Sequence, residues 1–272
     1  MKLKHILGVP LAVLMGYALG SCDTINEDER LIFVGKAEVN RSVLIEDFTG
    51  QRCVNCPVAT EELEKLQRQY GEDAIIVVGI HSGPFGHRTT MTSPRLPLCT
   101  ETGDAYYTHW GIESQPGVMI NRSAPIYNPA QYNDVVSQII TKSTPLDLAL
   151  DAQYDAETRN VAISIQATAN KDVSGKLQVW VVENNIVAQQ SMPDGSNNPD
   201  YVHQHVFRTS VTDDIYGDDI SVEGNTTTAG SVEYQTTLAD DWKPEEVAVV
   251  AFVSNAGEGV LQVVKTKLTI ND

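Results

Sequence analysis

Two cysteines separated by two residues, at the junction between an apolar run and a helical pattern, constrain this chain most. Cys53 and Cys56 follow a stretch that runs from Val43 to Asp47 and turns at Gly50. Apolar residues then recur at helical spacing. This order predicts a strand, a tight turn and a helix that carries a dithiol at its N-terminal end.

The position of the dithiol predicts its chemistry. The free backbone N–H groups and the positive dipole end of a helix favour an anion, so a thiolate at this place has a lowered pKa. Cys53 is therefore predicted to be the attacking sulfur, and Cys56, one helical turn later, is within reach to resolve a mixed disulfide. Asp47 lies on the strand before Cys53, where a buried carboxylate can take and return the proton of the inner thiol.

The spacing from Asp47 to Cys56 resembles that of the thioredoxin superfamily. A second match is the segment 111–120, which resembles the part of that fold that places a cis proline opposite the dithiol. The resemblance implies that Pro116 is this proline and that, together with Gln115, it orients an extended substrate backbone. Two matches in the expected order favour the resemblance more than a lone Cys-x-x-Cys would.

The first residues of the chain predict its compartment. Residues 1–21 have the basic start, apolar core and small residues of a signal peptide. Leu19-Gly20-Ser21-Cys22 resembles the bacterial lipoprotein box, which implies cleavage before Cys22 and acylation of that cysteine. The alternative is a secretory signal followed by an incidental cysteine. No other stretch approaches the roughly 20 apolar residues that span a bilayer, so lipid is the predicted anchor and residues 22–42 are its tether.

Cys99 is the cysteine left over once Cys22 is assigned to lipid and Cys53 and Cys56 to the dithiol. It lies in a proline-broken insertion at residues 93–100. The favoured interpretation is a buried or partly buried free thiol. The alternative is a third redox sulfur that exchanges with Cys53 or with a partner.

The hydrophobic pattern changes period near the middle of the chain. Residues 102–110 and 129–142 read as helices that complete an α/β thioredoxin-like domain over residues 43–145. Beyond it, short runs with a period of two, separated by turn residues, predict an antiparallel, Ig-like β-sandwich of about seven strands over residues 146–272. The predicted fold class is therefore α/β plus all-β.

The histidines do not predict a metal site. His203 and His205 fall on one face of a strand predicted at residues 201–208, where a neutral, hydrogen-bonded pair on the sandwich surface is favoured over metal ligation. The remaining histidines lack the paired spacing of a structural zinc site. The sequence predicts no cofactor either, since no nucleotide-binding loop stands out.

The net charge of the chain limits the kinds of partner that it can bind. The chain has a formal net charge of −17 at pH 7, and residues 146–272 carry 7 basic and 20 acidic side chains. A surface of this sign repels nucleic acid and anionic lipid headgroups. We therefore expect no nucleic-acid partner, and contact with a membrane only through the N-terminal lipid.

The order of the parts resembles one group of proteins. The lipoprotein signal, the dithiol domain, the sequence Gly103-Asp104-Ala105-Tyr106 before the proline segment and the final β-rich half are similar to the outer membrane protein family of Bacteroidetes named for its twenty-eight-kilodalton founder. The resemblance implies an immunogenic outer-membrane lipoprotein, facing the periplasm or the cell surface, in a family sometimes proposed to contain receptors or adhesins.

Two functions from different classes remain open at this point. The first is an extracytoplasmic thiol–disulfide oxidoreductase that acts on protein thiols and disulfides. The second is a non-enzymatic surface receptor or adhesin that binds a host-surface protein and in which the Cys53–Cys56 pair is structural. The presence of Asp47 and Pro116 beside both cysteines favours the first, although a fold alone does not fix a function.

Overall fold

The computed structural model describes residues 39–88, 96–212, 215–225 and 230–271. All described residues belong to one compact unit, Lys36–Asp272. Cys22, the predicted signal peptide and most of the predicted tether lie outside the described residues. Within the described residues, no helix is long and apolar enough to cross a membrane.

The first half begins with the predicted strand, turn and helix. Strand β1 (Val43–Thr49) leads through the turn at Gly50 into α1 (Cys56–Tyr70), and β2 (Ile75–His81) then pairs with β1 in parallel. Proline is tolerated in the first turn of α1, and Gly71, with φ of 102°, ends the helix. Every residue of both strands is buried, as expected of strands covered on two faces.

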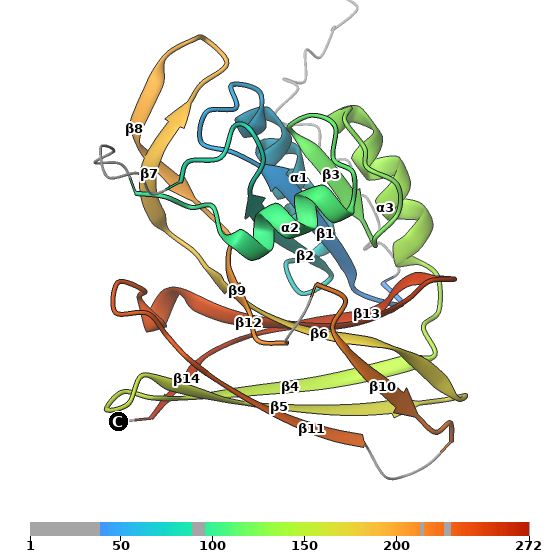
Figure 1. Cartoon of the computed structure of the whole chain (residues 1–272). Helices are drawn as coiled ribbons and strands as arrows, with labels where there is room; N and C mark the ends of the chain where they lie inside the picture. Colours follow the sequence, from blue (N-terminus) through green and yellow to red (C-terminus); the bar gives the residue numbers. More distant parts are fainter. Residues whose placement is uncertain (1–38, 89–95, 213–214, 226–229, 272) are drawn as a thin grey trace, which may run out of the picture. The chain divides into compact units, whose positions relative to one another are not determined.

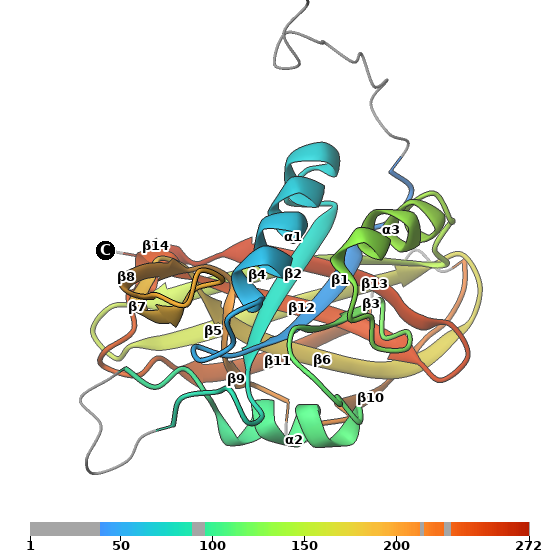
Figure 2. The ribbon, with the colours of Figure 1, turned by 90° about the horizontal axis from the view of Figure 1, so that it is seen from above.

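The rest of this half completes the layer around β1. Helix α2 (Glu101–His109) starts at Thr100, whose hydroxyl accepts a hydrogen bond from the Gly103 N–H. Strand β3 (Gly117–Ile120) pairs antiparallel with β1 and is followed by the 3₁₀ turn η2 (Pro129–Gln131) and α3 (Tyr132–Ile140). Viewed from above, α1 and α3 lie on one side of these strands and α2 on the other (Figure 2).

The second half consists of strands and one short 3₁₀ turn. Its elements are β4 (Leu146–Asp155), β5 (Asn160–Ala169), β6 (Val173–Glu183), β7 (Ile186–Ser191), β8 (Asn197–His203), β9 (Val206–Ser210), β10 (Asp218–Val222), β11 (Gly230–Thr237), η3 (Pro244–Glu246), β12 (Val247–Asn255), β13 (Gly259–Lys267) and β14 (Thr269–Asn271). The alternation of buried and exposed residues along β4 and β5 follows the predicted period of two. The described residues are thus mostly β-sheet with few helices.

One sheet runs through both halves of the chain (Figure 1). Its strand order is β13-β12-β6-β9-β2-β1-β3, with β10 paired to β6, and β9 meets β2 through the parallel pair Gly79 and Val206. A second sheet has the order β11-β5-β4-β14, and β7 and β8 form a separate hairpin. The predicted boundary at residue 145 stays a prediction, because Lys36–Asp272 is one compact unit.

The two faces of β1 contribute to different cores. Val43 and Ile45 pack with α1 and α3, whereas Leu44 and Phe48 pack with Trp180 and other residues of the second half. A third core lies between the four-stranded sheet and β6, β12 and β13 of the large sheet. Side chains of alternating residues on β1 therefore enter different environments.

One predicted strand is broken. The sequence predicts one strand over residues 201–208, but β8 ends at His203 and β9 starts at Val206. His205 between them has a φ of 56°, which interrupts the extended backbone. This break turns the chain from the hairpin into the large sheet.

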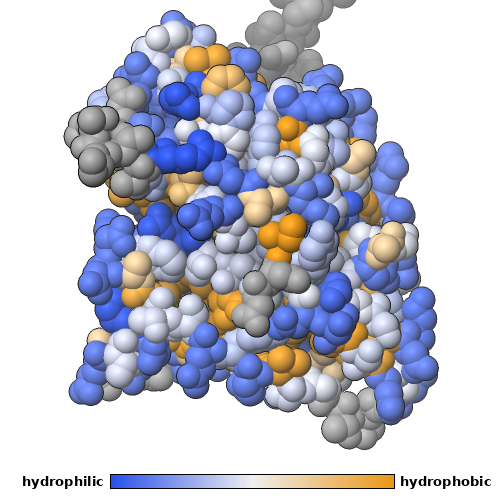
Figure 3. All heavy atoms as spheres, viewed as in Figure 1, coloured by the Kyte–Doolittle hydropathy of each residue, from blue (hydrophilic) through white to orange (hydrophobic). Residues whose placement is uncertain are grey.

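On the face shown in Figure 3, apolar side chains form small separate groups among hydrophilic ones.

Candidate functional site

The two cysteines lie where the sequence predicts them. Cys53 ends the turn after β1, Cys56 is the first residue of α1, and the two form a disulfide. Gly50 is required in this turn because a Cβ there would lie 2.5 Å from the carbonyl carbon of Phe85. After reduction, both sulfurs would lie at the positive end of the helix dipole, where a thiolate is stabilised.

Cys53 is covered rather than exposed. Its exposed fraction is 3%, and that of Cys56 is 2%. The β7–β8 hairpin stands beside the loop that carries Cys53 (Figure 1) and is hydrogen-bonded to it. The Gln190 side-chain amide donates to the carbonyl oxygens of Cys53 at 2.9 Å and Gly50 at 3.3 Å, and the Ser191 N–H donates to the Gln51 carbonyl at 2.8 Å. A partner disulfide cannot reach Cys53 until this cover moves.

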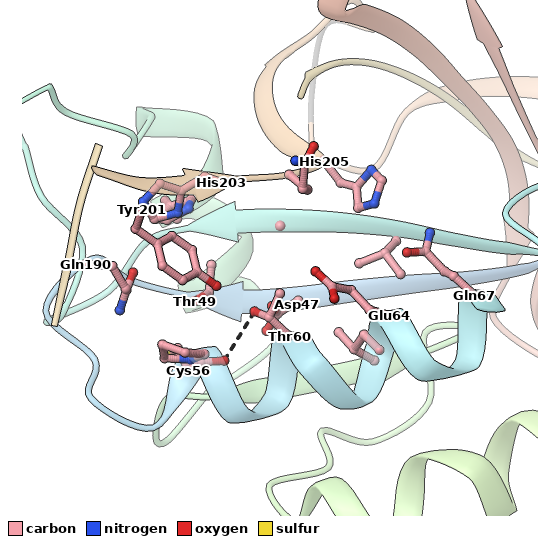
Figure 4. Close-up of a pocket in the computed structure, with 16 residues that line it drawn as sticks. Asp47, Thr49, Cys56, Thr60, Glu64, Gln67, Gln190, Tyr201, His203 and His205 are labelled. Carbon is pink, nitrogen blue, oxygen red and sulfur yellow. Dashed lines mark hydrogen bonds between the residues drawn. The ribbon is translucent and has the colours of Figure 1, made fainter. Parts of the chain in front are cut away.

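Asp47 is held in the same place as the inner cysteine. It lies on the face of β1 that packs against α1, and both it and Cys56 line one enclosed cavity (Figure 4). Asp47 is 3% exposed, and its Oδ1 has no hydrogen-bond partner among the residues that the structure describes. Burial raises the pKa of Asp47 to about 7. A carboxyl with this pKa can both accept and return a proton near neutral pH.

Residues of the second half form the opposite wall of the cavity. Tyr201 and His203 come from β8, and His205 from the break that follows it (Figure 4). His203 is 5% exposed, so its predicted position on the surface is wrong, whereas His205 has an intermediate exposure. His203 packs edge to face against His81 of the first half, and this contact covers a side chain that a surface strand would leave exposed. The sequence carries no local signal for this arrangement.

Three imidazoles around the cavity are kept neutral by burial. Desolvation lowers the pKa of both His203 and His205 to about 4. It lowers the pKa of His81 well below the ordinary value, and the His203 and Arg208 side chains act in the same direction. The His81 and His203 rings meet edge to face, with centroids 5.0 Å apart. His81 Nδ1 and His203 Nε2 have no hydrogen-bond partner among the described residues.

The proline segment has the predicted geometry at its main chain. The bond between Gln115 and Pro116 is cis and leads directly into β3. The Gln115 side-chain amide donates to the carbonyl oxygens of Thr49 at 2.6 Å and Ser82 at 3.0 Å, and its oxygen accepts from the Phe85 N–H. This side chain is therefore occupied inside the protein, and any contact of this segment with a substrate would use the main chain.

Cys99 is a free thiol of intermediate exposure, in line with the favoured interpretation. Burial raises its pKa to about 11, with Arg88 acting in the opposite direction. Its sulfur packs so closely on Gly86 that a Cβ there would collide with it. A thiol with this pKa is a poor nucleophile at neutral pH. Cys22, the predicted lipidation site, lies outside the described residues.

Comparisons with known proteins give a family match and a fold match. The family model described as Outer membrane protein Omp28 matches residues 103–272. Among solved structures, HBP35 of Porphyromonas gingivalis has a TM-score of 0.65 and 20% sequence identity, covering 86% of this chain and 77% of that chain. At this identity, the likeness shows a shared fold.

A curated relative is also similar in sequence. Protein SUPPRESSOR OF QUENCHING 1, chloroplastic, of Arabidopsis thaliana is 25% identical over an alignment of 181 residues that covers 57% of this chain. The match covers only 16% of that relative, so the chain corresponds to a small part of it.

Proposed function

The chain belongs to the Outer membrane protein Omp28 family, and on that premise we propose that it is a lipid-anchored outer-membrane protein that carries out thiol–disulfide exchange outside the cytoplasm. We further propose that residues 43–145 form a thioredoxin-like domain and residues 146–272 an Ig-like β-sandwich domain. The β1-α1-β2 unit with its dithiol supports the first assignment. The core between two sheets supports the second.

The observation that carries the proposed activity is the Asp47 carboxyl. It is buried in the same cavity as Cys56, and this burial raises its pKa to about 7. Burying an ionisable group in this way is costly, so a purely structural disulfide gives no reason to keep it. A buried carboxyl that shares a cavity with the inner cysteine suits proton transfer during thiol exchange.

The proposed exchange proceeds in two steps. The Cys53 thiolate attacks one sulfur of a substrate disulfide, which forms a mixed disulfide and releases the first substrate thiolate. Asp47 then takes the proton of the Cys56 thiol. The resulting Cys56 thiolate attacks the Cys53 sulfur, which forms the Cys53–Cys56 disulfide and releases the second substrate thiolate. The protein is oxidised by two electrons and the substrate is reduced by two; with a substrate dithiol, the same steps run in reverse.

A second candidate function has its own observation. Cys53 is 3% exposed and its loop is tied to the β7–β8 hairpin, as expected of a structural disulfide in a surface receptor or adhesin. In that case a host-surface protein would bind elsewhere on the molecule and the cysteines would take no part. The accessibility of the disulfide to reductants separates the two candidates.

The test measures redox chemistry directly. We expect the wild type to reduce insulin disulfides when supplied with a small-molecule thiol, and the Cys53→Ser variant to lose this activity. The reduction potential of the Cys53–Cys56 pair should lie in the range of redox-active rather than structural disulfides, roughly above −300 mV. A pair that resists reduction, in a protein whose partner binding is unchanged by Cys53→Ser, would establish the second candidate instead.

A further inference from the structure

One stripe of side chains on α1 lines the cavity, from Cys56 at its buried end to Glu64 at its exposed end. Cys56, Thr60 and Glu64 are spaced four residues apart, so they lie on the same face of the helix, and all three line the cavity. The Thr60 hydroxyl donates to the Cys56 carbonyl at 3.2 Å, as the dashed line in Figure 4 shows. The stripe starts at the fully enclosed Cys56 and ends at Glu64, whose side chain is 44% exposed.

Tyr201 faces this stripe from the second half of the chain. In Figure 4 its ring extends from β8 across the cavity, with the hydroxyl toward Asp47 and Thr60. Burial, together with the Glu64 and Asp47 carboxylates, raises the pKa of Tyr201. The Tyr201 and Thr60 hydroxyls and the Asp47 and Glu64 carboxyl groups all line this one cavity.

A buried proton acceptor needs a connection to water. Asp47 is 3% exposed, and each cycle of exchange requires it to release the proton taken from Cys56. The cavity has a volume of about 30 Å³, room for roughly two water molecules. Hydroxyl groups and enclosed water both donate and accept hydrogen bonds, so together they can pass a proton along.

The histidines on the opposite wall offer no such exit. His81 and His203 are 3% and 5% exposed, so neither ring opens to solvent. Burial keeps both imidazoles from binding a proton near neutral pH. Glu64 also lines this cavity, and its side chain is 44% exposed. It therefore offers a connection to the solvent.

We propose that Asp47 exchanges its proton with solvent through the Tyr201 and Thr60 hydroxyls and the Glu64 carboxylate, so that the second half of the chain supplies a residue of the proton path. This proposal rests on the proposed thiol exchange, which gives Asp47 a proton to move. Tyr201, Thr60 and Glu64 act through Asp47 and are positioning residues rather than catalytic ones.

Other groups set the electrostatic surroundings of the path. The ionisable side chains that face Asp47 from the elements packed around it are Glu64 on α1, His81 on β2, Tyr132 on α3, Tyr201 and His203 on β8, and His205 before β9. Of these, Glu64 has a side chain that is 44% exposed and reaches the solvent. Its replacement by glutamine therefore tests the exit with one change.

The experiment follows the protonation of Asp47 in the oxidised protein. The infrared carbonyl band of its protonated carboxyl is identified by its loss in Asp47→Asn, and its relaxation is measured after a pH jump across pH 7. We expect this relaxation to slow roughly tenfold or more in Glu64→Gln and in Tyr201→Phe, in line with the loss of a positioned proton-transfer group. High concentrations of a small buffer acid should restore the rate in Glu64→Gln.

Glu62→Gln is the matched control. Glu62 lies on the same helix and pairs with Lys65 at 2.8 Å, but it does not line the cavity. In this variant the Asp47 band should relax at the wild-type rate. A wild-type rate in both Glu64→Gln and Tyr201→Phe would overturn the proposed path, as would the absence of a titrating Asp47 band. The measurement needs no substrate, so its outcome is separate from the insulin assay, whose failure would overturn the proposed function.

Discussion

Glu46 and Asp47 are neighbours on β1, yet the two faces of the strand treat their carboxyl groups differently. Glu46 is fully buried and accepts a hydrogen bond from Arg122 at 3.4 Å. The guanidinium of Arg122 lies over the Phe252 ring, 4.6 Å from its centroid. Asp47 lies on the opposite face, and burial raises its pKa to about 7.

The difference separates a structural charge from a chemical one. Burial raises the pKa of Glu46, and the Arg122 guanidinium beside it acts against this rise. Nothing opposes the effect of burial on Asp47, and its pKa reaches about 7. Glu46 is held in an ion pair with Arg122, whereas the Asp47 carboxyl is left to bind and release a proton.

The largest effect is expected from breaking the Glu46 pair. Arg122→Met leaves a buried carboxylate without its cation, which should lower the free energy of unfolding by roughly 3–5 kcal/mol. Chemical denaturation at pH 7 measures this loss. The double variant Arg122→Met with Glu46→Gln should recover part of it, and a single variant as stable as the wild type would show that the pair contributes nothing.

The opposite sign is expected at Asp47. Its folded pKa of about 7 exceeds the ordinary 3.8, so protonation stabilises the fold below pH 4 and this stability is lost as pH rises through 7. Asp47→Asn removes the penalty and should stabilise the protein at pH 8 by up to about 4 kcal/mol. Thermal unfolding followed against pH should show the gain vanish near pH 4; a variant less stable than the wild type at pH 8 would contradict the assignment.

The imidazoles of the Asp47 face give a dependence on pH in the other direction. The folded pKa of His203 is about 4, below the ordinary 6.5, so its stabilising contribution is present above pH 6.5 and is lost as pH falls toward 4. We expect protonation of this histidine to lower the free energy of unfolding by up to about 3 kcal/mol over that range. His203→Gln should flatten the fall in stability between pH 6.5 and 4, and an unchanged slope would exclude His203 as its source.

The smallest expected effect concerns the cover over the dithiol. Gln190→Ala removes the amide that holds the Cys53 and Gly50 carbonyls, which should cost about 1 kcal/mol. The disulfide should then be reduced up to about tenfold faster by a small thiol, because the cover opens more often. The control is Gln189→Ala, whose side chain bonds only Asn197 within the hairpin. Equal reduction rates in both variants would show that the hairpin does not limit access.

Much of the first half could be predicted from the sequence. The order of β1, α1 and β2, the position of the dithiol and the face of β1 that carries Asp47 follow from apolar periodicity and turn residues over short distances. The second half was predicted less completely. The exposed face of β11 and the polar residues of β8 hide those strands, and single-sequence patterns do not show which strands pair.

The sequence by itself determined the local chemistry: two sulfurs at the start of a helix, a carboxyl on the strand before it and a proline before β3. Only the tertiary structure decided what surrounds them. Gln190 is 137 residues from Cys53, yet it covers that residue, and Tyr201 and His203 complete the cavity at Asp47. Local spacing fixes contacts within one strand and helix, but contacts over such distances depend on how all the sheets pack, because burial is a property of the whole fold.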